Sequence, residues 1–395
     1  MVTETLLTQV FGLLGALLIL AFFANRLFRR TRMPDVVILM TTGLILGPLS
    51  GWINADQFKM FTQYLGTFAL ILILFEAGSE LHMREALRRF PAAVLFGFLG
   101  YGLSFAALAS VALGVLKLSI HQALLLGAVF GCTSSTMVIP VLQQFEVRGL
   151  VAVVLILEAA LGDVISVISV GTLVEMSRGD SLITGLVTGF LVRTTVAVIF
   201  AILAGILWSR VRSRFAADRF GNALHIGGVL VVYALVRIAG GSGLLAVLAF
   251  GLTLANVRQG ANRNGGGNDQ GFLIFHSDLS FLVRSFFFVL LGASVEFIGR
   301  PYVIAAVLVI IGLILARAIA VYSTGWTLQG VSRRERELMM FLFPRGLVNA
   351  VLAIQVAGYE AEMAFLPAMA FTVILITNLI MVLGAFRCPP GSSVS

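Results

Sequence analysis

The sequence predicts an all-α polytopic membrane protein with about thirteen transmembrane helices. Three observations support this fold class. Apolar residues make up 59% of the chain and charged residues only 12%, whereas a soluble domain carries roughly twice that share of charge. The mean hydropathy is +1.02. Apolar runs of about twenty residues, each long enough to cross a ~30 Å hydrocarbon layer, recur along the whole chain.

These runs leave no room for a soluble catalytic domain. The first run follows Glu4 and precedes the basic segment from Arg26 to Arg32, which is not typical of a cleavable signal peptide. The two cysteines, Cys132 and Cys388, do not indicate a disulfide framework. The predicted spans lie near residues 5–25, 34–53, 62–79, 91–116, 121–142, 149–174, 183–209, 222–239, 242–256, 273–295, 301–325, 337–358 and 364–386.

Basic residues are concentrated in alternate loops. If the N-terminus lies outside, the inner loops hold most of the 27 Lys and Arg residues, which is the positive-inside pattern. The net charge of +8 is therefore a topology signal and does not indicate nucleic-acid binding. We expect an outside N-terminus, a cytoplasmic C-terminus and a flexible inner loop over the Gly-rich segment from Gln259 to Gln270.

Short segments of the first half of the chain recur in the second half. Residues 42–46 in the second span match residues 250–254 in the ninth, and residues 75–80 match residues 291–296. The matched spans have opposite directions across the membrane. Inverted repeats of this kind are typical of secondary transporters, which bind substrate near the membrane midplane. We expect one transmembrane domain over 1–395, with repeats at about 5–174 and 222–386 linked by the span at 183–209.

Four charged residues lie within predicted spans. They are Glu158 and Asp163 in the sixth span, Arg317 in the eleventh and Arg345 in the twelfth. A charged side chain at the bilayer centre costs about 2.5–3.5 kcal/mol on insertion scales. We therefore expect each of them to be functional or paired, and a purely structural ion pair is the alternative.

The spacing of the two acids separates their roles. Residues five apart on a helix are rotated by about 140° and displaced by ~7.5 Å, so Glu158 and Asp163 are not expected to face the same partner. Arg317 is the natural partner for Glu158, because its guanidinium keeps its charge and can hold a carboxylate with two hydrogen bonds. That pairing leaves Asp163 without a fixed counter-ion. A lone carboxylate in a desolvated cavity favours binding a proton or a cation.

The fifth span contains an unusual polar run in mid-membrane. Four consecutive hydroxylated residues, Thr133 to Thr136, follow Gly131 and precede Pro140, and hydroxyl groups compete with helical hydrogen bonds. The twelfth span has a matching interruption at Pro344, Arg345 and Gly346, where proline removes a backbone hydrogen bond. Two interrupted helices at matching positions of inverted halves point to a transport site. The alternative is that the hydroxyls only join helices.

Over essentially the whole chain, these features resemble the monovalent cation:proton antiporters of the sodium/proton-exchanger type. The resemblance implies a rigid dimerisation domain, hence a homodimer, and a six-helix core in which two unwound helices cross. It also implies that Asp163 binds the ion and that Glu158 and Arg317 form a stabilising pair. The segments that carry it are Met33-Pro34 to Gly43, Gly47-Pro48, residues 75–81, Thr133-Ser134, residues 158–163, residues 286–292, residues 316–322 and residues 345–348.

Two positions depart from the family pattern. This chain has Thr133-Ser134 where many members have Thr-Asp, and Gly162-Asp163 where they have Asn-Asp or Asp-Asp. The hydroxyl-rich substitution is similar to the potassium-efflux branch of the superfamily, so both Na⁺ and K⁺ stay open as the transported cation.

We therefore expect a secondary antiporter that exchanges Na⁺ or K⁺ for protons in a bacterial or archaeal inner membrane. Asp163 with Thr133, Ser134 and Ser135 would bind the ions, and a single free carboxylate predicts electroneutral exchange. No metal-ligand cluster, phosphate loop or nucleophile–base pair occurs in the sequence, so we expect no enzyme, no cofactor and no resident metal. Two alternatives are a sodium-coupled symporter of a small organic anion, for which Arg345 is the candidate anion ligand, and a gated cation channel.

Two further groups of polar residues are less informative. Glu76 and Glu80 end the third span, where a solvated interfacial role is expected. Asp278 and Arg284 are six apart on one helix and therefore on different faces, although either could line the route to the site.

Overall fold

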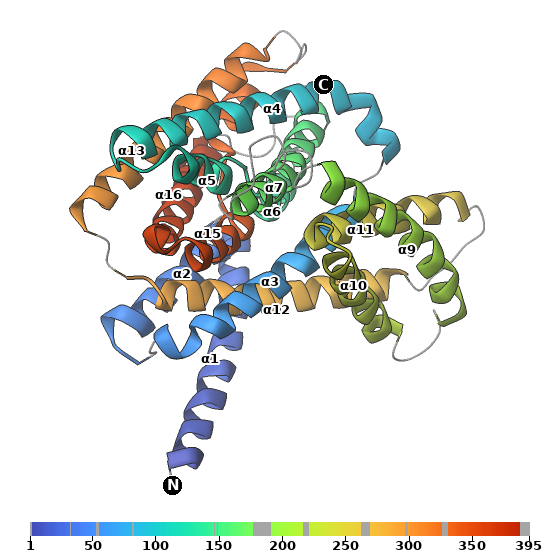
Figure 1. The fold of residues 1–395 in the computed structure, drawn as a ribbon, viewed down its shortest axis with the longest axis horizontal. Coiled ribbons are helices and arrows are strands. Elements are labelled where there is room, and N and C mark those ends of the chain that lie inside the picture. The colour runs from blue at the N-terminus through green and yellow to red at the C-terminus, as the bar shows by residue number, and fades with distance from the viewer. Residues whose placement is uncertain are drawn as a thin grey trace.

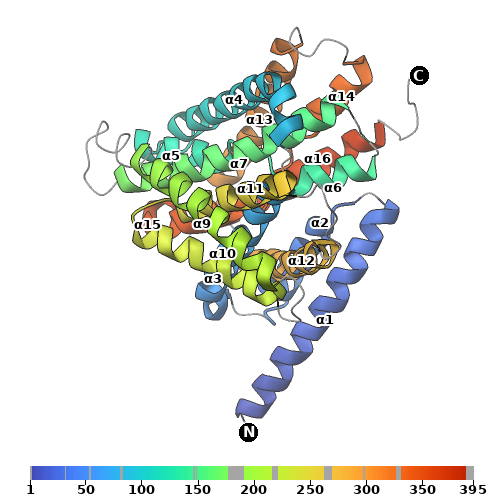
Figure 2. The ribbon, with the colours of Figure 1, turned by 90° about the vertical axis from the view of Figure 1, so that its right-hand side faces the viewer.

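The protein is an assembly of helices packed side by side (Figures 1 and 2). The structure, a computed structural model, describes residues 2–31, 33–52, 55–80, 83–145, 147, 149–176, 191–215, 221–261, 269–296, 299–325 and 331–387. Within these ranges there is no β-strand. The helices are α1 (Val2–Thr31), α2 (Asp35–Leu44), α3 (Ala55–Glu80), α4 (Met83–Gly114), α5 (Ile120–Phe130), α6 (Ser135–Gln144), α7 (Leu150–Met176), α9 (Arg193–Phe215), α10 (Gly221–Ile238), α11 (Gly243–Ala261), α12 (Asp269–Ala293), α13 (Arg300–Ser323), α14 (Arg333–Phe341), α15 (Leu347–Tyr359) and α16 (Leu366–Arg387).

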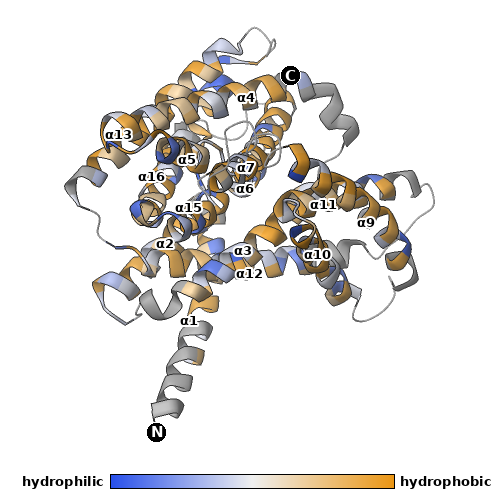
Figure 3. Cartoon of the chain, viewed as in Figure 1, coloured by the Kyte–Doolittle hydropathy of each residue, from blue (hydrophilic) through white to orange (hydrophobic). Residues whose placement is uncertain are grey.

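The predicted membrane fold class is confirmed by the length and composition of these helices. In the described part of the chain, nine are long and apolar enough to cross a membrane, and four shorter apolar helices accompany them. Most of the ribbon that is coloured by hydropathy in Figure 3 is in the hydrophobic range. The total of thirteen spans stays a prediction. The long apolar helices include Met60–Ser79, Ala93–Gly114, Leu150–Val174, Tyr302–Ser323 and Ala361–Gly384, and the shorter ones are Gly15–Phe28, Asp35–Leu49, Gly243–Val257 and Leu347–Tyr359.

Some expected boundaries differ from those observed. A π-helical turn at Ile45–Leu49, which contains Pro48, extends α2. The Gly-rich loop expected over 259–270 is shorter, because α11 continues to Ala261 and α12 begins at Asp269. Arg258 and Gln259 are good helix formers and allow that extension. Residues 262–268, Arg32 and Cys388 lie outside the described residues.

The helices form two bundles, and each bundle takes helices from both halves of the chain. Helices α1, α2, α3, α9, α10, α11 and α12 pack on one another and are called the α12 bundle here. Helices α4, α5, α6, α7, α13, α14, α15 and α16 form the second, which we call the crossover bundle. In Figure 1 the crossover bundle is at the upper left and the α12 bundle runs along the lower and right sides. Helices α15 and α16 contact α3 and α2 across the junction.

Two close helix contacts depend on glycines that lie within the repeat segments. A Cβ atom on Gly43 of α2 would overlap the backbone of Val289 on α12, and one on Gly292 of α12 would overlap Met40. Gly78 of α3 and Gly251 of α11 face each other's helices in the same way. The predicted repeat equates α2 with α11 and α3 with α12. The two contacts correspond to each other under that assignment, and the inverted repeat itself stays a prediction.

Two transmembrane passages are interrupted, as their sequences predict. Helix α5 ends at Phe130 and α6 begins at Ser135, so residues 131–134 are unwound. Helix α14 ends at Phe341 and α15 begins at Leu347, with an extended segment over 342–346. Both segments are buried in the crossover bundle, where irregular backbone at membrane depth is tolerated.

Candidate functional site

The two unwound segments meet inside the crossover bundle. The Ser134 amide donates a hydrogen bond to the Pro344 carbonyl (2.9 Å), and Arg345 Nε donates to the Phe130 carbonyl (2.9 Å). These bonds connect positions more than two hundred residues apart in the sequence. Each unwound segment therefore satisfies part of the other's backbone, which unwinding would otherwise leave unpaired.

Asp163 of α7 lies beside the first unwound segment and is 1% exposed. Its Oδ2 accepts hydrogen bonds from Ser135 Oγ (2.6 Å) and from the Ser135 amide (3.3 Å). Ser135 is the first residue of α6, and amide groups at a helix N-terminus favour a nearby negative charge. The second oxygen, Oδ1, is buried and accepts no hydrogen bond from the described residues. Asp163 thus has one oxygen held by hydrogen bonds and one that can accept a proton or bind a cation.

The neighbouring hydroxyl groups predicted to bind the ion point in different directions. Thr133 Oγ1 lies 3.4 Å from Arg345 Nη1 and accepts a hydrogen bond from it. Ser134 Oγ lies 2.9 Å from Thr136 Oγ1 and packs against Gly346. Of the three predicted residues, only Ser135 contacts the Asp163 carboxylate directly.

Glu158 and Arg317 form a buried ion pair that is separate from Asp163. Arg317 Nη1 lies 2.8 Å from Glu158 Oε1, and both side chains are about 5% exposed or less. Arg317 also donates to the carbonyls of Met339 and Leu342 at the end of α14, each at 2.8 Å. Its guanidinium lies over the Phe96 ring, 4.7 Å from the centroid. The arginine therefore joins α7 and α13 to the end of the second interrupted helix.

Arg345 binds the unwound backbone rather than a carboxylate. Besides the bond to Phe130, its guanidinium donates to the carbonyls of Phe343 (2.9 Å) and Gly131 (3.4 Å). Its own backbone is held by α16, since its amide donates to Thr377 Oγ1 (3.1 Å) and its carbonyl accepts from Asn378 Nδ2 (2.8 Å). The positive charge is 1% exposed and is fixed next to the crossing.

Asn349 is a site residue that the sequence analysis missed. Its side chain is fully buried, and its Oδ1 accepts a hydrogen bond from the Gly346 amide (2.9 Å) at the start of α15. Its Nδ2 donates to the carbonyl of Val129 (2.8 Å) and lies 3.2 Å from Cys132 Sγ. One amide side chain thus caps both interrupted helices. An asparagine three residues after Gly346 has the spacing of a capping residue. This spacing could have identified Asn349 from the sequence.

The charged residues of the α12 bundle make contacts between its helices. Arg284 of α12 bonds to Asp35 of α2, with Nη2 and Oδ2 3.2 Å apart, and not to Asp278 on its own helix, in agreement with the different helix faces expected for these two residues. Asp35 was not considered in the sequence analysis, because it lies at the end of its span. Glu76 Oε2 lies 4.0 Å from His276 Nδ1. Glu76 is therefore in the junction of α3 and α12.

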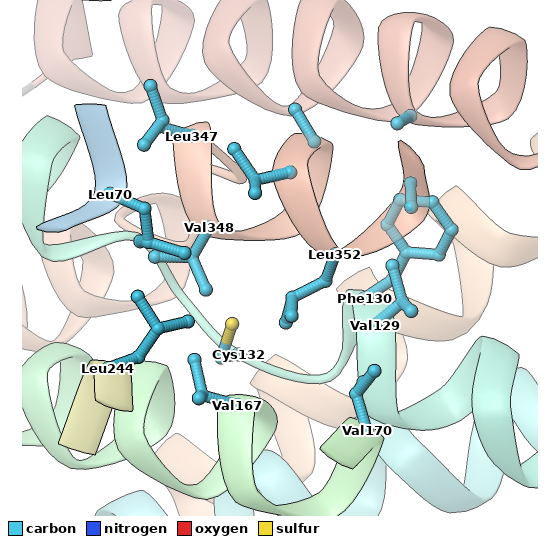
Figure 4. Close-up of a cluster of buried hydrophobic side chains, with 14 of the residues drawn as sticks. Leu70, Val129, Phe130, Cys132, Val167, Val170, Leu244, Leu347, Val348 and Leu352 are labelled. Atoms are coloured by element: carbon cyan, nitrogen blue, oxygen red, sulfur yellow. The ribbon is translucent and has the colours of Figure 1, made fainter. Parts of the chain in front are cut away.

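A cavity of about 670 Å³ opens between the two bundles. Its lining includes a group of buried apolar side chains, Val167 and Val170 of α7, Leu244 of α11 and Leu352 of α15. A second, much smaller cavity adjoins it at Val167 and Leu244 and is lined, among the described residues, only by apolar ones, which include Leu74 and Val164. Figure 4 shows Val167, Leu244, Val348 and Leu352 gathered around Cys132 of the unwound segment. Apolar side chains therefore separate the cavity from the unwound segment and from Asp163, which is one helical turn from Val167.

Comparison with known proteins gives consistent matches over almost the whole chain. The family described as sodium/hydrogen exchanger, transmembrane, matches residues 16–386. Na(+)/H(+) antiporter 1 of Methanocaldococcus jannaschii is 26% identical over 89% of this chain and 84% of its own length. K(+)/H(+) antiporter NhaP2 of Shewanella baltica is 26% identical over 94% of this chain and 64% of its own length, so this chain spans less than two thirds of that relative. The solved structure of the sodium proton antiporter MjNhaP1 of Methanocaldococcus jannaschii at pH 8 has a TM-score of 0.79 at 24% identity, covering 97% of this chain and 98% of that one.

Proposed function

Since the chain belongs to the sodium/hydrogen exchanger family, we propose that it is a secondary antiporter that exchanges Na⁺ or K⁺ for protons. The relatives named above include both a sodium and a potassium antiporter. The family consists of transporters, and the chain is not an enzyme. Asp163 is the group at which the cation and the proton compete.

The observation that carries this proposal is the environment of the Asp163 carboxylate. Its Oδ2 is anchored by Ser135, and its Oδ1 is buried beside unwound backbone without a hydrogen bond from the described residues. A buried carboxylate is costly unless a proton or a cation compensates its charge. One carboxylate can hold one proton or one monovalent cation at a time. Exchange therefore moves one positive charge in each direction and is electroneutral.

The remaining oxygen ligands come from the crossing. Hard monovalent cations bind hydroxyl and carbonyl oxygens, as the hard divalent cations do. Ser135 Oγ is already at the carboxylate, and the Thr133 and Ser134 hydroxyls lie on the same unwound segment. In our proposal these three residues bind the ion together with Asp163. Neither hydroxyl contacts Asp163 in this state, so a small rotation of the unwound segment would accompany cation binding.

Five other residues support the site without binding the ion. Arg345 holds carbonyls of both unwound segments, and Pro344 and Gly346 keep the second segment extended around it. Glu158 and Arg317 fix the end of α14. Arg345, Glu158 and Arg317 keep their charges through the transport cycle, so only Asp163 exchanges a proton for a cation.

The surroundings of Arg345 argue against the symporter alternative. An organic anion would need an accessible positive group, whereas the Arg345 guanidinium is buried and donates to three carbonyls and a hydroxyl. A channel would need a continuous polar path. The cavity between the bundles instead adjoins a smaller cavity whose described lining is entirely apolar and includes Leu74, Val164 and Val167.

The expected membrane arrangement completes the proposal. The N-terminus lies outside and the C-terminus in the cytoplasm of a bacterial or archaeal cell, as the basic loops predict. The protein forms a homodimer, in keeping with the rigid dimerisation domain that the family resemblance implies. With the N-terminus outside, the cavity between the bundles opens to the external face, because it includes Arg237 and Tyr359 at outer helix ends.

The test is a proteoliposome assay that reports internal pH while Na⁺, K⁺ or Li⁺ is added outside. The antiporter should alkalinise or acidify the lumen according to the cation gradient, and at least one of the three cations should be active. Asp163→Asn, nearly isosteric but unable to release a proton, should be inactive while eluting as the parent does on size exclusion. Exchange by a well-folded Asp163→Asn protein would remove Asp163 from the mechanism. Pure cation flux without proton movement would favour a channel.

A further inference from the structure

Gly162, the residue before Asp163, lies at a close contact between α7 and the first unwound segment. A Cβ atom at this position would lie 3.2 Å from the Cβ of Cys132, 3.6 Å from its Cα and 3.7 Å from the Thr133 amide nitrogen. Cys132 is itself in contact with the second interrupted helix, since its sulfur lies 3.2 Å from Asn349 Nδ2. The substitution Gly162→Ala would therefore require the unwound segment to move away from α7 by a few tenths of an ångström.

The contact at Gly162 lies between two hydrogen bonds that hold α7 against the first interrupted helix. On one side, the Asp163 carboxylate accepts hydrogen bonds from Ser135 at the start of α6. On the other side, the buried Ser166 hydroxyl donates to the Ala128 carbonyl of α5 at 2.6 Å. Three contacts therefore fix how far α7 lies from the unwound segment, and with that distance the space around the Asp163 carboxylate.

The width of this space affects which cation fits, because cations of different size need different distances to their oxygen ligands. The oxygen distances of Mg²⁺ and Ca²⁺ differ by roughly 0.2–0.6 Å, and proteins select between these ions by cavity size, ligand number and flexibility. The displacement that a Cβ atom on Gly162 would require is of the same order. A close-packed interior transmits such a displacement to its neighbours.

We propose that Gly162 is a specificity-determining residue, because the absence of a side chain lets α7 lie close to the unwound segment and keeps the ion-binding space at Asp163 small. This inference rests on the proposed exchange at Asp163. A small space favours the smaller monovalent cations, whose oxygen ligands must approach closely. A wider space favours the larger ones. Gly162 binds no ion itself and acts through the position of the unwound segment.

The experiment compares Gly162→Ala with the parent in the proteoliposome assay at alkaline pH, where protons compete least with cations. Half-saturating concentrations are measured for Li⁺, Na⁺, K⁺ and Rb⁺, and a cation that is not transported is measured by its inhibition of one that is. In Gly162→Ala the ratio of the K⁺ value to the Na⁺ value should fall roughly fivefold, a fraction of the effect that an inserted methyl group has in a close-packed interior. The shift should be larger for Rb⁺ against Li⁺.

Two further variants separate the contact from a general effect on α7. Gly171→Ala makes the same substitution on the same helix, where a Cβ atom would meet nothing within 4 Å in the described part of the chain outside its own helix backbone, and it should keep the parent's ratio. Cys132→Gly removes the Cβ atom that Gly162→Ala would approach. In the Cys132→Gly background, Gly162→Ala should therefore change the ratio by less than about twofold, as expected when the two sites no longer touch.

Cation binding is also measured without exchange, as the rise in thermal midpoint that each cation gives the purified protein in detergent. The order of the four cations should shift toward the larger ones in Gly162→Ala and stay that of the parent in Gly171→Ala. An unchanged K⁺ to Na⁺ ratio in Gly162→Ala, an equal shift in Gly171→Ala, or an undiminished shift in the Cys132→Gly background would overturn the inference. If the parent itself shows no exchange, the proposed function fails instead.

Discussion

Replacing Arg317 by alanine should destabilise the protein far more than replacing its partner Glu158 by glutamine. Arg317→Ala leaves Glu158 buried without its counter-charge, which typically costs about 3–5 kcal/mol. It also leaves the carbonyls of Met339 and Leu342 without the donors seen at 2.8 Å, at about 1 kcal/mol each. The expected loss is about 5–7 kcal/mol. Glu158→Gln keeps an oxygen that can accept from Arg317 and leaves both carbonyl bonds intact.

The assay is the thermal midpoint of purified protein in detergent, followed by loss of the folded peak on size exclusion. A domain of 150–250 residues shifts ~2–4 °C per kcal/mol, and this chain of 395 residues should shift about half as much because its unfolding entropy is about twice as large. We therefore expect Arg317→Ala to lower the midpoint by roughly 5–15 °C. Glu158→Gln should cause less than half that shift. The control is Arg333→Ala, whose exposed pair with Glu337 is of a kind that contributes little. An Arg317→Ala midpoint equal to that of the parent would refute the reasoning.

Two further predictions concern the ion-binding site. With the membrane potential set by an ionophore, the reversal point of exchange should not move with voltage, and the apparent cation affinity should rise with pH because one carboxylate serves both ions. A voltage-dependent reversal point would contradict the one-carboxylate mechanism. Asn349→Leu, which keeps the branched side-chain shape but removes the cap on both interrupted helices, should lower the melting midpoint and reduce exchange at least tenfold in proteoliposomes. Parent-like exchange by this variant would show that the cap is not needed.

The interrupted helices could be predicted because their cause is local. Gly131 and the run of hydroxylated residues weaken helical hydrogen bonding in one passage, and Pro344 removes a donor in the other. The Glu158–Arg317 contact was also accessible from the sequence, since few charged residues lie in mid-membrane and each needs a partner. Local residue types were therefore sufficient to predict the interrupted helices, and the few charged residues in mid-membrane were sufficient to predict the ion pair.

The orientation of side chains within the unwound segments could not be predicted. The helical period of 3.6 residues fixes directions only while the backbone is helical, and it ends at Phe130. Thr133 and Ser134 accordingly face Arg345 and Thr136 instead of Asp163. The partners of Arg345 are mostly backbone carbonyls, which every residue has, so no residue type in the sequence marks them.

The polar contacts of the site belong almost entirely to the crossover bundle. This arrangement bears on how Asp163 can be exposed to each face of the membrane in turn. The bonds of Asp163, Arg345, Asn349 and Arg317 all join helices of the crossover bundle. Toward the α12 bundle, the site is covered by apolar side chains (Figure 4). A polar contact between α15 and α3, from Gln355 to Thr67, is long at 3.5 Å. Apolar contacts are non-directional, whereas each buried hydrogen bond has a defined geometry. A displacement of the crossover bundle against α3 and α11 would therefore preserve the ion-binding geometry, while a change within the crossover bundle would disrupt it.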